Sequence, residues 1–124
     1  MTRGRVYTVE EANAMLPELR ERLERIRAAR QTLLRTAEKI RGTVANDGGG
    51  RDGGRDYWDA KQILGSEVAR LAELEIALRD PESGLVDFPG DRDGDPVFLC
   101  WRADEDQVGH WHDQSTGFSG RKPL

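Results

Sequence analysis

Residues 8–44 decide the fold; they read TVEEANAMLPELRERLERIRAARQTLLRTAEKIRGTV. Thr8 and Glu11 have the spacing of a capping box, which predicts that a helix begins directly after the threonine. Pro17 removes a backbone donor, so we expect a kink, or a short helix followed by a long one. Apolar residues recur three and four positions apart, with Arg30 as the polar exception, which is typical of a coiled-coil seam. The seam positions are Val9, Ala12, Leu16, Leu19, Leu23, Ile26, Arg30, Leu33, Ala37, Ile40 and Val44.

A second helix is predicted over residues 57–79, because the same spacing returns there. Its seam positions are Tyr57, Ala60, Leu64, Glu67, Leu71, Leu74 and Leu78. Residues 42–56 between the helices are rich in glycine and lack large apolar residues, which indicates a flexible tip. The two helices therefore form an antiparallel hairpin over residues 8–80. One hairpin leaves an apolar flank uncovered, so we expect a homodimer that buries it in a four-helix bundle.

After Gly84 the apolar period changes from about 3.5 to 2, which predicts strands at 85–88, 97–101 and 108–112. Short connections rich in turn-forming or acidic residues separate them. The predicted fold class is α+β: an antiparallel two-helix coiled-coil hairpin followed by a small three-stranded antiparallel β-meander. We expect residues 1–124 to form a single domain, with the meander and C-terminal tail in residues 84–124.

The register of the meander assigns its residues to two faces. A turn around Glu105 pairs Cys100 with His110, Phe98 with His112, and Leu99 with Trp111; Val86 is expected opposite Leu99 and Phe88 opposite Val97. The face expected to pack on the helices carries Val86, Phe88, Val97, Leu99, Trp101 and Trp111. The other face carries Leu85, Asp87, Phe98, Cys100, His110 and His112.

The second face offers a candidate metal site. Cys100, His110 and His112 supply a thiol and two imidazoles, a ligand set that suits zinc or iron, and Asp87 is a weaker candidate for a fourth ligand. The alternative is that this face is solvated or packs against a partner. No residue is predicted to be catalytic, because no nucleophile motif is present and Cys100 lies within a strand, away from a helix N-terminus.

The distribution of charge and of apolar residues limits the classes of partner that we expect. The formal net charge is −4, so we expect no nucleic-acid partner. Residues 9–41 hold eight basic and six acidic side chains, whereas residues 80–113 hold two and ten, which favours docking between the two halves or between copies. No segment approaches the about 18 apolar residues of a membrane span, so we expect no membrane association and a cytoplasmic location. Cys100 is the only cysteine, which excludes an internal disulfide.

Three stretches carry a resemblance: YTVEEANAMLPELR, GLVDFPGDRDGDPVFLCWR and VGHWHDQSTGFSGRKPL. Together they resemble the small prokaryotic family catalogued as domain of unknown function 2203, for which no activity or cofactor is assigned. The resemblance implies that Trp101, Trp111, Phe118 and Arg121 belong to the family pattern. From its own residues, the tail is expected to form an ordered cap, and Phe118 and Arg121 to stand at the rim of a groove.

Three functional hypotheses follow. The leading one is a non-enzymatic, dimeric interaction or scaffold module with a protein partner. The alternative is a zinc- or iron-binding protein that uses Cys100, His110, His112 and Asp87. The third compares the hairpin with coiled-coil factors that bind RNA polymerase through an acidic tip, where this chain has Asp47, Asp52 and Asp56.

Overall fold

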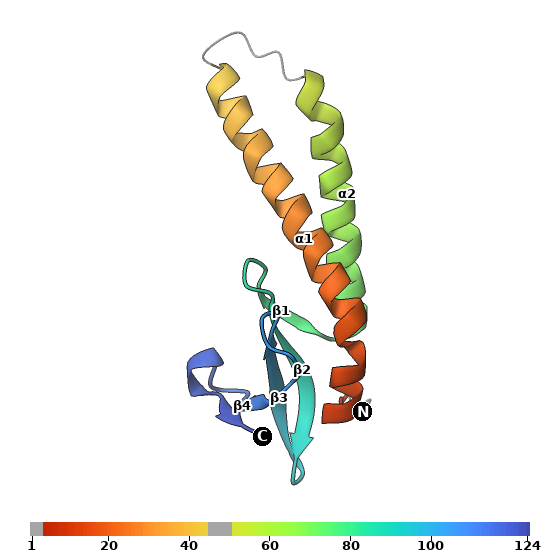
Figure 1. Cartoon of the computed structure of the whole chain (residues 1–124), viewed down its shortest axis with the longest axis vertical. Coiled ribbons are helices and arrows are strands. Elements are labelled where there is room, and N and C mark those ends of the chain that lie inside the picture. Colours follow the sequence, from red (N-terminus) through yellow and green to blue (C-terminus); the bar gives the residue numbers. More distant parts are fainter. Residues whose placement is uncertain (1–3, 45–50) are drawn as a thin grey trace.

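A computed structural model describes residues 4–44 and 51–124, and the side chains of these residues outside 40–53. A helical hairpin stands on a small β-sheet, and its upper half projects beyond that sheet (Figure 1). The strands form one antiparallel sheet in the order β1-β2-β3-β4-β5. In chain order the elements are α1 (Val9–Val44), α2 (Arg51–Glu73), β1 (Ala77–Asp80), β2 (Leu85–Arg92), β3 (Asp95–Arg102), β4 (His110–Asp113), the 3₁₀ helix η1 (Phe118–Gly120) and β5 (Lys122–Pro123).

The capping box at the start of α1 is confirmed. The Glu11 backbone N–H donates to Thr8 Oγ1 at 3.0 Å, and the Thr8 N–H donates to Glu11 Oε1 at 2.9 Å. The helix continues through Pro17 without interruption, so the alternative of two separate helices is wrong. Burial of the flanking Leu16 and Leu19, which are 4% and 0% exposed, offsets the backbone hydrogen bond that the proline removes.

The seams of the two helices face each other and the sheet. Most of the predicted seam positions from Ala12 to Ile26, and from Ala60 to Leu74, are buried. At Arg30, the polar exception, the neighbouring Ala29 is buried instead, and the arginine lies 3.5 Å from Glu82 Oε1. The structure shows a packed antiparallel hairpin; the coiled-coil geometry stays a prediction.

The predicted glycine-rich tip is too long. Helix α1 extends to Val44 and α2 begins at Arg51, so residues 42–44 and 51–56 are helical. Residues 45–50, which include Asp47, lie outside the described residues, as does the side chain of Asp52. The hypothesis of an acidic tip for RNA polymerase therefore stays a prediction.

The prediction that the second helix continues to residue 79 is wrong. Helix α2 ends at Glu73, and residues 77–80 form β1. The Ile76 N–H donates to Leu71 O at 3.0 Å and the Glu75 N–H to Ala72 O at 3.0 Å, which is a Schellman motif with Glu75 at φ +58°. Glycine is the usual residue at that position, and its absence concealed the end of the helix.

The meander has five strands instead of the predicted three. Its second hairpin has the predicted register, with Leu99 opposite Trp111. The first hairpin differs by two residues, because Val86 pairs with Trp101 and Phe88 with Leu99. The turn there is a tight Asp93–Gly94 pair with φ of +54° and +91°, whereas a longer loop was expected. A register shift of two residues leaves each side chain on the same face of the sheet. The residues predicted to pack on α1 therefore do so, among them Val86, Phe88, Leu99 and Trp101.

No helix among residues 4–44 and 51–124 has an apolar stretch of the length that a bilayer span requires.

The charge pattern favoured a contact between the basic and acidic halves of the chain, and Arg20 makes such a contact. Its guanidinium donates to the backbone oxygens of Ala103 at 2.8 Å and Glu105 at 2.9 Å.

Glu67 is a charged residue at a seam position of the hairpin. Its side chain is 9% exposed and accepts from Arg22 Nη1 and Arg25 Nε, each at 2.5 Å. Burial raises the pKa of this carboxyl, but the hydrogen bonds from Arg25 and Arg22 outweigh it and hold the pKa below its usual value. The ionised form is therefore stabilising above the usual pKa, and the stabilisation is lost as the pH falls through the lowered value.

Replacing this carboxylate should destabilise the hairpin. We expect Glu67→Ala to lower the free energy of unfolding at neutral pH by about 1–3 kcal/mol, because it leaves Arg25 without its ion-pair partner and Arg22 with Glu18 alone. Urea denaturation followed by circular dichroism measures the change. The control is Glu73→Ala, whose side chain is 67% exposed and pairs with Arg70; equal effects of the two substitutions would contradict the role assigned to Glu67.

Candidate metal centre

The outer face of the sheet, opposite α1, brings together the polar residues of three strands. Asp87 on β2 lies directly opposite Cys100 on β3, which in turn lies opposite His110 on β4. His112 occupies the next row of the same face, opposite Phe98. The predicted pairs, Val86 with Leu99 and Phe88 with Val97, would put Asp87 opposite Phe98; the observed register, shifted by two residues, puts it opposite Cys100.

Asp87, Cys100 and His112 form a compact buried group. One ligand atom from each lies within 4.8 Å of the other two. The three residues are 3%, 0% and 2% exposed. Ligands about 2.0–2.3 Å from a tetrahedral metal lie about 3.3–3.8 Å apart, so shifts of about 1 Å or less would allow all three to bind one ion.

Both ring nitrogens of His112 face oxygen acceptors. Its Nδ1 lies 2.8 Å from the backbone oxygen of Asp113, and its Nε2 lies 3.0 Å from Asp87 Oδ1. A carbonyl oxygen only accepts, so the contact with Asp113 favours the tautomer that has its proton on Nδ1 and the lone pair of a neutral imidazole on Nε2. A metal bound at Nε2 would take the place of the contact with Asp87. Metal-binding histidines commonly donate their second nitrogen to a carbonyl in this way.

Arg79 fixes the other side of the Asp87 carboxylate. Its Nε donates to Asp87 Oδ2 at 2.9 Å, which leaves Oδ1 directed at His112. The β1–β2 register is irregular between Leu78 and Asp80, where Arg79 stands. Such irregularities redirect side chains, and here the arginine extends over the Phe98 ring, 5.1 Å from its centroid.

Cys100 is a poor nucleophile in this environment. Burial raises the pKa of its thiol to about 11, with a further increase from the neighbouring Asp87 carboxylate, while Arg121 acts in the opposite direction. The thiol is thus protonated at neutral pH, and the two nitrogens of His112 are directed at Asp113 and Asp87 rather than at sulfur. The group therefore lacks the thiolate–imidazole pair of a cysteine hydrolase, but a metal ion would deprotonate the thiol.

A pocket of about 410 Å³ opens onto the three residues. Its far wall is the segment between β4 and η1, residues 114–117, together with Phe118 of η1. Gly120 allows this segment to fold tightly, since a Cβ at its position would lie 2.8 Å from Thr116 Cβ. The C-terminal tail, predicted to be an ordered cap, thus forms the wall of a pocket over the candidate ligands.

His110 lies outside the compact group. Its Nδ1 is buried without a hydrogen-bond partner and lies 3.6 Å from Glu105 Oε2. Glu105 accepts two bonds from Arg121, at 3.0 and 2.8 Å, and Arg121 Nη1 lies 4.0 Å from Cys100 Sγ. The structure therefore brings together three of the four residues predicted as metal ligands, and the fourth is directed toward an ion pair.

The stretches that suggested a family extend from the N-terminal cap to the C-terminal tail, and all of them are ordered parts of one fold. A family model, described as an uncharacterized conserved protein (DUF2203), matches residues 5–124. The chain belongs to the DUF2203 family. No significant match was found among curated proteins or among solved structures.

The residues named by the resemblance lie in different places in this DUF2203 member. Trp101 is fully buried against α1, and its Nε1 donates to Glu105 O at 3.0 Å. Trp111 is half-buried between the cations of Arg92 and Lys122. Only Phe118 lines the pocket, and Arg121 lies close to Cys100.

Sequence reasoning did not identify Arg79 or Glu105 as part of the site. Arg79 was assigned to the last turn of a helix, and Glu105 was treated as the centre of a turn. The signal that could have identified Glu105 is its position in an acidic loop, ADED, facing a chain end that contains Arg121.

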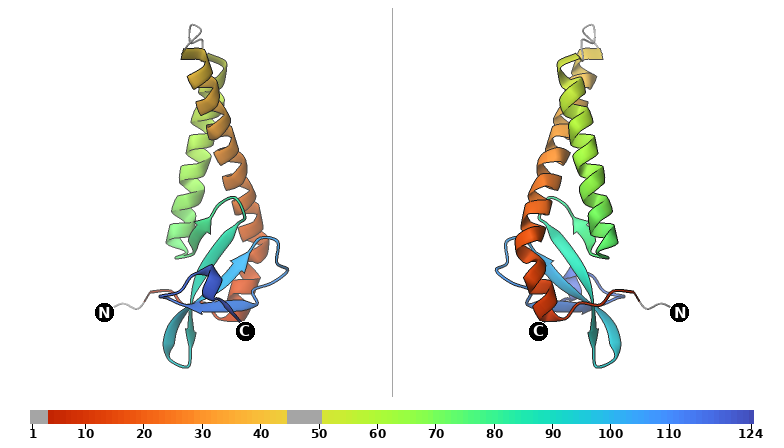
Figure 2. Two further views of the ribbon diagram at one scale, coloured as in Figure 1. Left: turned by 90° about the vertical axis from the view of Figure 1, so that its left-hand side faces the viewer. Right: turned by 90° about the vertical axis from the view of Figure 1, so that its right-hand side faces the viewer.

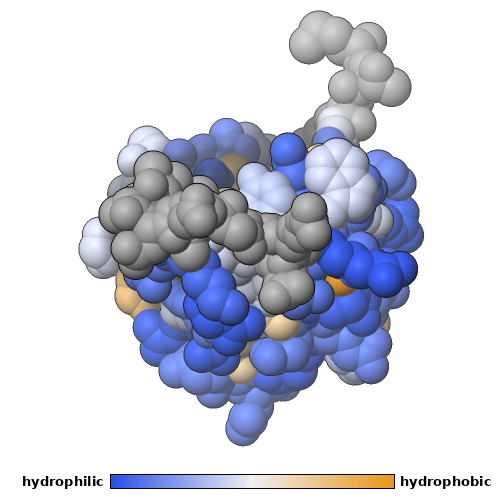
Figure 3. Space-filling model, turned by 90° about the horizontal axis from the view of Figure 1, so that it is seen from above, coloured by the Kyte–Doolittle hydropathy of each residue, from blue (hydrophilic) through white to orange (hydrophobic). Residues whose placement is uncertain are grey.

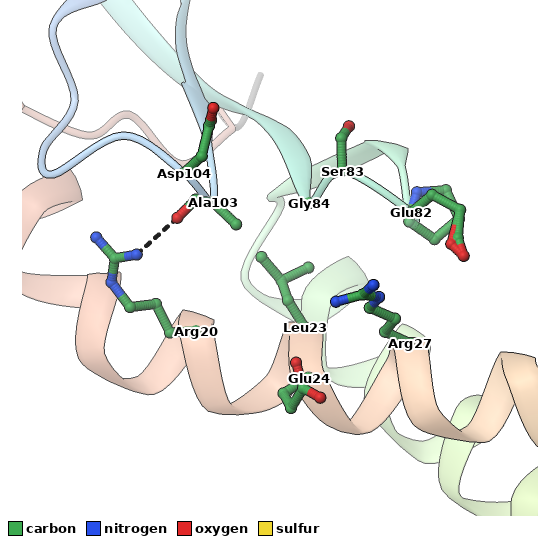
Figure 4. Close-up of a pocket in the computed structure, with 10 residues that line it drawn as sticks. Arg20, Leu23, Glu24, Arg27, Glu82, Ser83, Gly84, Ala103 and Asp104 are labelled. Carbon is green, nitrogen blue, oxygen red and sulfur yellow. Dashed lines mark hydrogen bonds between the residues drawn. The ribbon is translucent and has the colours of Figure 1, made fainter.

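A second pocket, of about 390 Å³, lies between α1 and the turns that follow β1 and β3 (Figure 4). Arg20, Leu23 and Arg27 approach it from the helix, and Gly84 and Ala103 from the sheet. Gly84 has φ +71° and a Cβ there would lie 2.7 Å from Ala103 Cβ, so this region is a close contact between helix and sheet. Its charged side chains have mixed sign. Among the described residues, the ligand cluster that was found is that of Asp87, Cys100 and His112, away from this pocket.

Cys100 should react slowly in the metal-free protein. A pKa of about 11 in place of 9.0 reduces the thiolate at neutral pH by about 100-fold, and burial slows attack further. We expect iodoacetamide to modify the native chain at least about 100-fold more slowly than the chain in concentrated urea, as measured by intact-mass spectrometry. Similar rates in both states would contradict the buried, protonated thiol.

Proposed function

We propose that this DUF2203 member is a metal-binding protein that holds a divalent transition metal, with zinc as the expected ion, between Asp87, Cys100 and His112. The observation that carries the proposal is the convergence of three different buried ligand atoms within 4.8 Å. Nitrogen and sulfur ligands together with one carboxylate are the donors that zinc takes in proteins, and ferrous iron is the alternative.

The surroundings support a ligand role for these residues. A buried carboxylate, thiol and imidazole are costly to place together unless they bind something or one another. The bond from His112 to Asp113 O orients Nε2, and the bond from Arg79 orients the Asp87 carboxylate. These bonds resemble the outer contacts that fix metal ligands.

The number of protein ligands favours a site with a free coordination position. Three protein ligands leave one tetrahedral position for water or a small molecule, as in catalytic rather than structural zinc sites. The pocket of about 410 Å³ beside the group provides room for such a ligand. The proposed function is thus metal binding with access for a small ligand.

The first test is uptake of metal by protein purified without an affinity tag. We expect about one zinc per chain by elemental analysis, and an affinity at least about 100-fold weaker for Asp87→Asn, Cys100→Ser and His112→Gln. His110→Gln is the matched control, since His110 lies on the same strand but outside the compact group. Cobalt(II) offers a readout on the unaltered protein, where a thiolate–cobalt charge-transfer band should appear.

Two results would overturn the proposal. One is the absence of stoichiometric binding of zinc, iron or cobalt by the folded chain. The other is binding that persists in Cys100→Ser but is lost in His110→Gln, which would locate the metal elsewhere on the face. Circular dichroism of each variant separates loss of a ligand from loss of the fold.

Metal binding should release a proton. The Cys100 thiol, whose pKa burial raises to about 11, has to lose its proton, so we expect release of about one proton per ion at neutral pH. Affinity should then fall steeply as the pH is lowered. Calorimetric titrations in buffers of different ionisation enthalpy measure the number of protons, and a count near zero would contradict the assigned ligands.

A further inference from the structure

We propose that the groove between α1 and α2 in the upper half of the hairpin binds a second copy of this chain. This groove, of about 330 Å³, lies away from the metal centre. In Figure 1 the two helices are apart at their upper ends, whereas the views turned by 90° (Figure 2) show them overlapping there and apart near the sheet, so the helices cross each other. The proposal is independent of the metal, and it locates the dimer interface that the seam pattern predicted.

The packing between the helices is thin in the upper half of the hairpin. Above Ile26 the buried residues among the described side chains are small: Ala29 and Ala60 are 5% and 4% exposed, and Thr36 is 9% exposed. Ile63, which lines the groove, is 43% exposed. Seen from above, the surface is mainly hydrophilic with a few scattered apolar residues (Figure 3). A partner is therefore more easily recognised by a narrow groove with matched charges than by a broad apolar patch.

The walls of the groove carry opposite charges that form no ion pair with one another or with any other residue that the structure describes. Arg35 lines it from α1, and Asp56 and Asp59 line it from α2. Among the described residues these three form no ion pair, and Arg35 has a hydrogen bond only to Thr32 Oγ1 at 3.3 Å.

The positions of these residues along the hairpin axis, here called their heights, are consistent with a two-fold symmetric dimer. The pair Arg25–Glu67 sets the alignment of the antiparallel helices. With a rise of 1.5 Å per residue, Arg35 lies about 15 Å above Arg25, and Asp56 lies about 16 Å above Glu67. A two-fold axis parallel to the hairpin places α1 of one copy beside α2 of the other at equal height. Arg35 then meets Asp56 and Asp59 of the second copy, and the reciprocal contact follows from symmetry.

The apolar residues fit the same arrangement. Ile63 lies about 6 Å above Glu67, and Ala29 lies about 6 Å above Arg25, so they are at one height. The Ile63 side chain of one copy can therefore pack into the space over Ala28 and Ala29 of the other. Small residues on one helix opposite a larger one on its neighbour allow the helices of a four-helix bundle to approach closely.

Sedimentation velocity on the full chain tests the proposal, with and without a chelator. At about 100 μM we expect a dimer with twice the 13.9 kDa chain mass. Added salt should weaken the association of the two copies. Arg35→Asp and Ile63→Glu should each weaken the dimer by about tenfold or more. The charge-swapped variant with Arg35→Asp, Asp56→Arg and Asp59→Arg should restore it relative to Arg35→Asp alone.

Arg27→Asp is the matched control. Arg27 is an exposed arginine on the same helix, and it lines the other pocket (Figure 4). This variant should dimerise like the unaltered chain. A monomeric unaltered chain at several hundred micromolar, or a charge-swapped variant as weak as Arg35→Asp, would overturn the proposal. An equal loss in Arg27→Asp would do so too, because it would show a general effect of charge.

Discussion

The burial of one face of the β2–β3 hairpin against the first half of α1 is the interaction on which the rest of the structure depends. Phe88, Val86 and Trp101 are fully buried there, together with Leu19 and Ile26 of the helix. Because strand side chains alternate, fixing this face also fixes the opposite one. Asp87 and Cys100 lie on the outer face because their neighbours in the chain belong to the core. The candidate metal centre is thus a geometric consequence of the hydrophobic contact.

Much of this arrangement could be predicted because it depends on periodicity. The three-four spacing identified both helices, and the alternation from Leu85 onward identified β2, β3 and β4. The two-residue error in the first hairpin did not change the faces, since any even shift leaves each side chain on its side of the sheet. It did change the neighbours of Asp87, which decides whether that carboxylate belongs to the site. Register within a face depends on turn geometry, and the Asp93–Gly94 turn was tighter than the sequence suggested.

Other parts could not be predicted, because they depend on tertiary contacts. Helix α2 ends at Glu73, and two residues later the Glu75 carboxylate accepts from the Arg5 backbone at 2.7 Å, a contact across 70 residues. That contact accompanies a left-handed conformation that propensity assigns to glycine. Because the chain leaves the helix there, residues 77–80 form β1, and this strand positions Arg79 beside Asp87. Tertiary contacts also determine that His112, rather than His110, belongs to the candidate site. His110 lies directly across from Cys100 but stands beside Glu105, whereas the more distant His112 lies 3.0 Å from Asp87 Oδ1.

The charges around the candidate metal centre bear on whether one buried group can exist both without and with an ion. Without metal, the Asp87 carboxylate is paired with Arg79 and the Cys100 thiol is neutral. A divalent ion would convert the thiol into a thiolate, and the carboxylate and thiolate together would balance the charge of the metal. The loss of the thiol proton therefore limits the net charge that an ion would add to the buried site. Burying additional net charge costs several kcal/mol, about the size of a whole domain's stability. A site that limits this cost can bind and release an ion with less opposition to the packing of the sheet on α1.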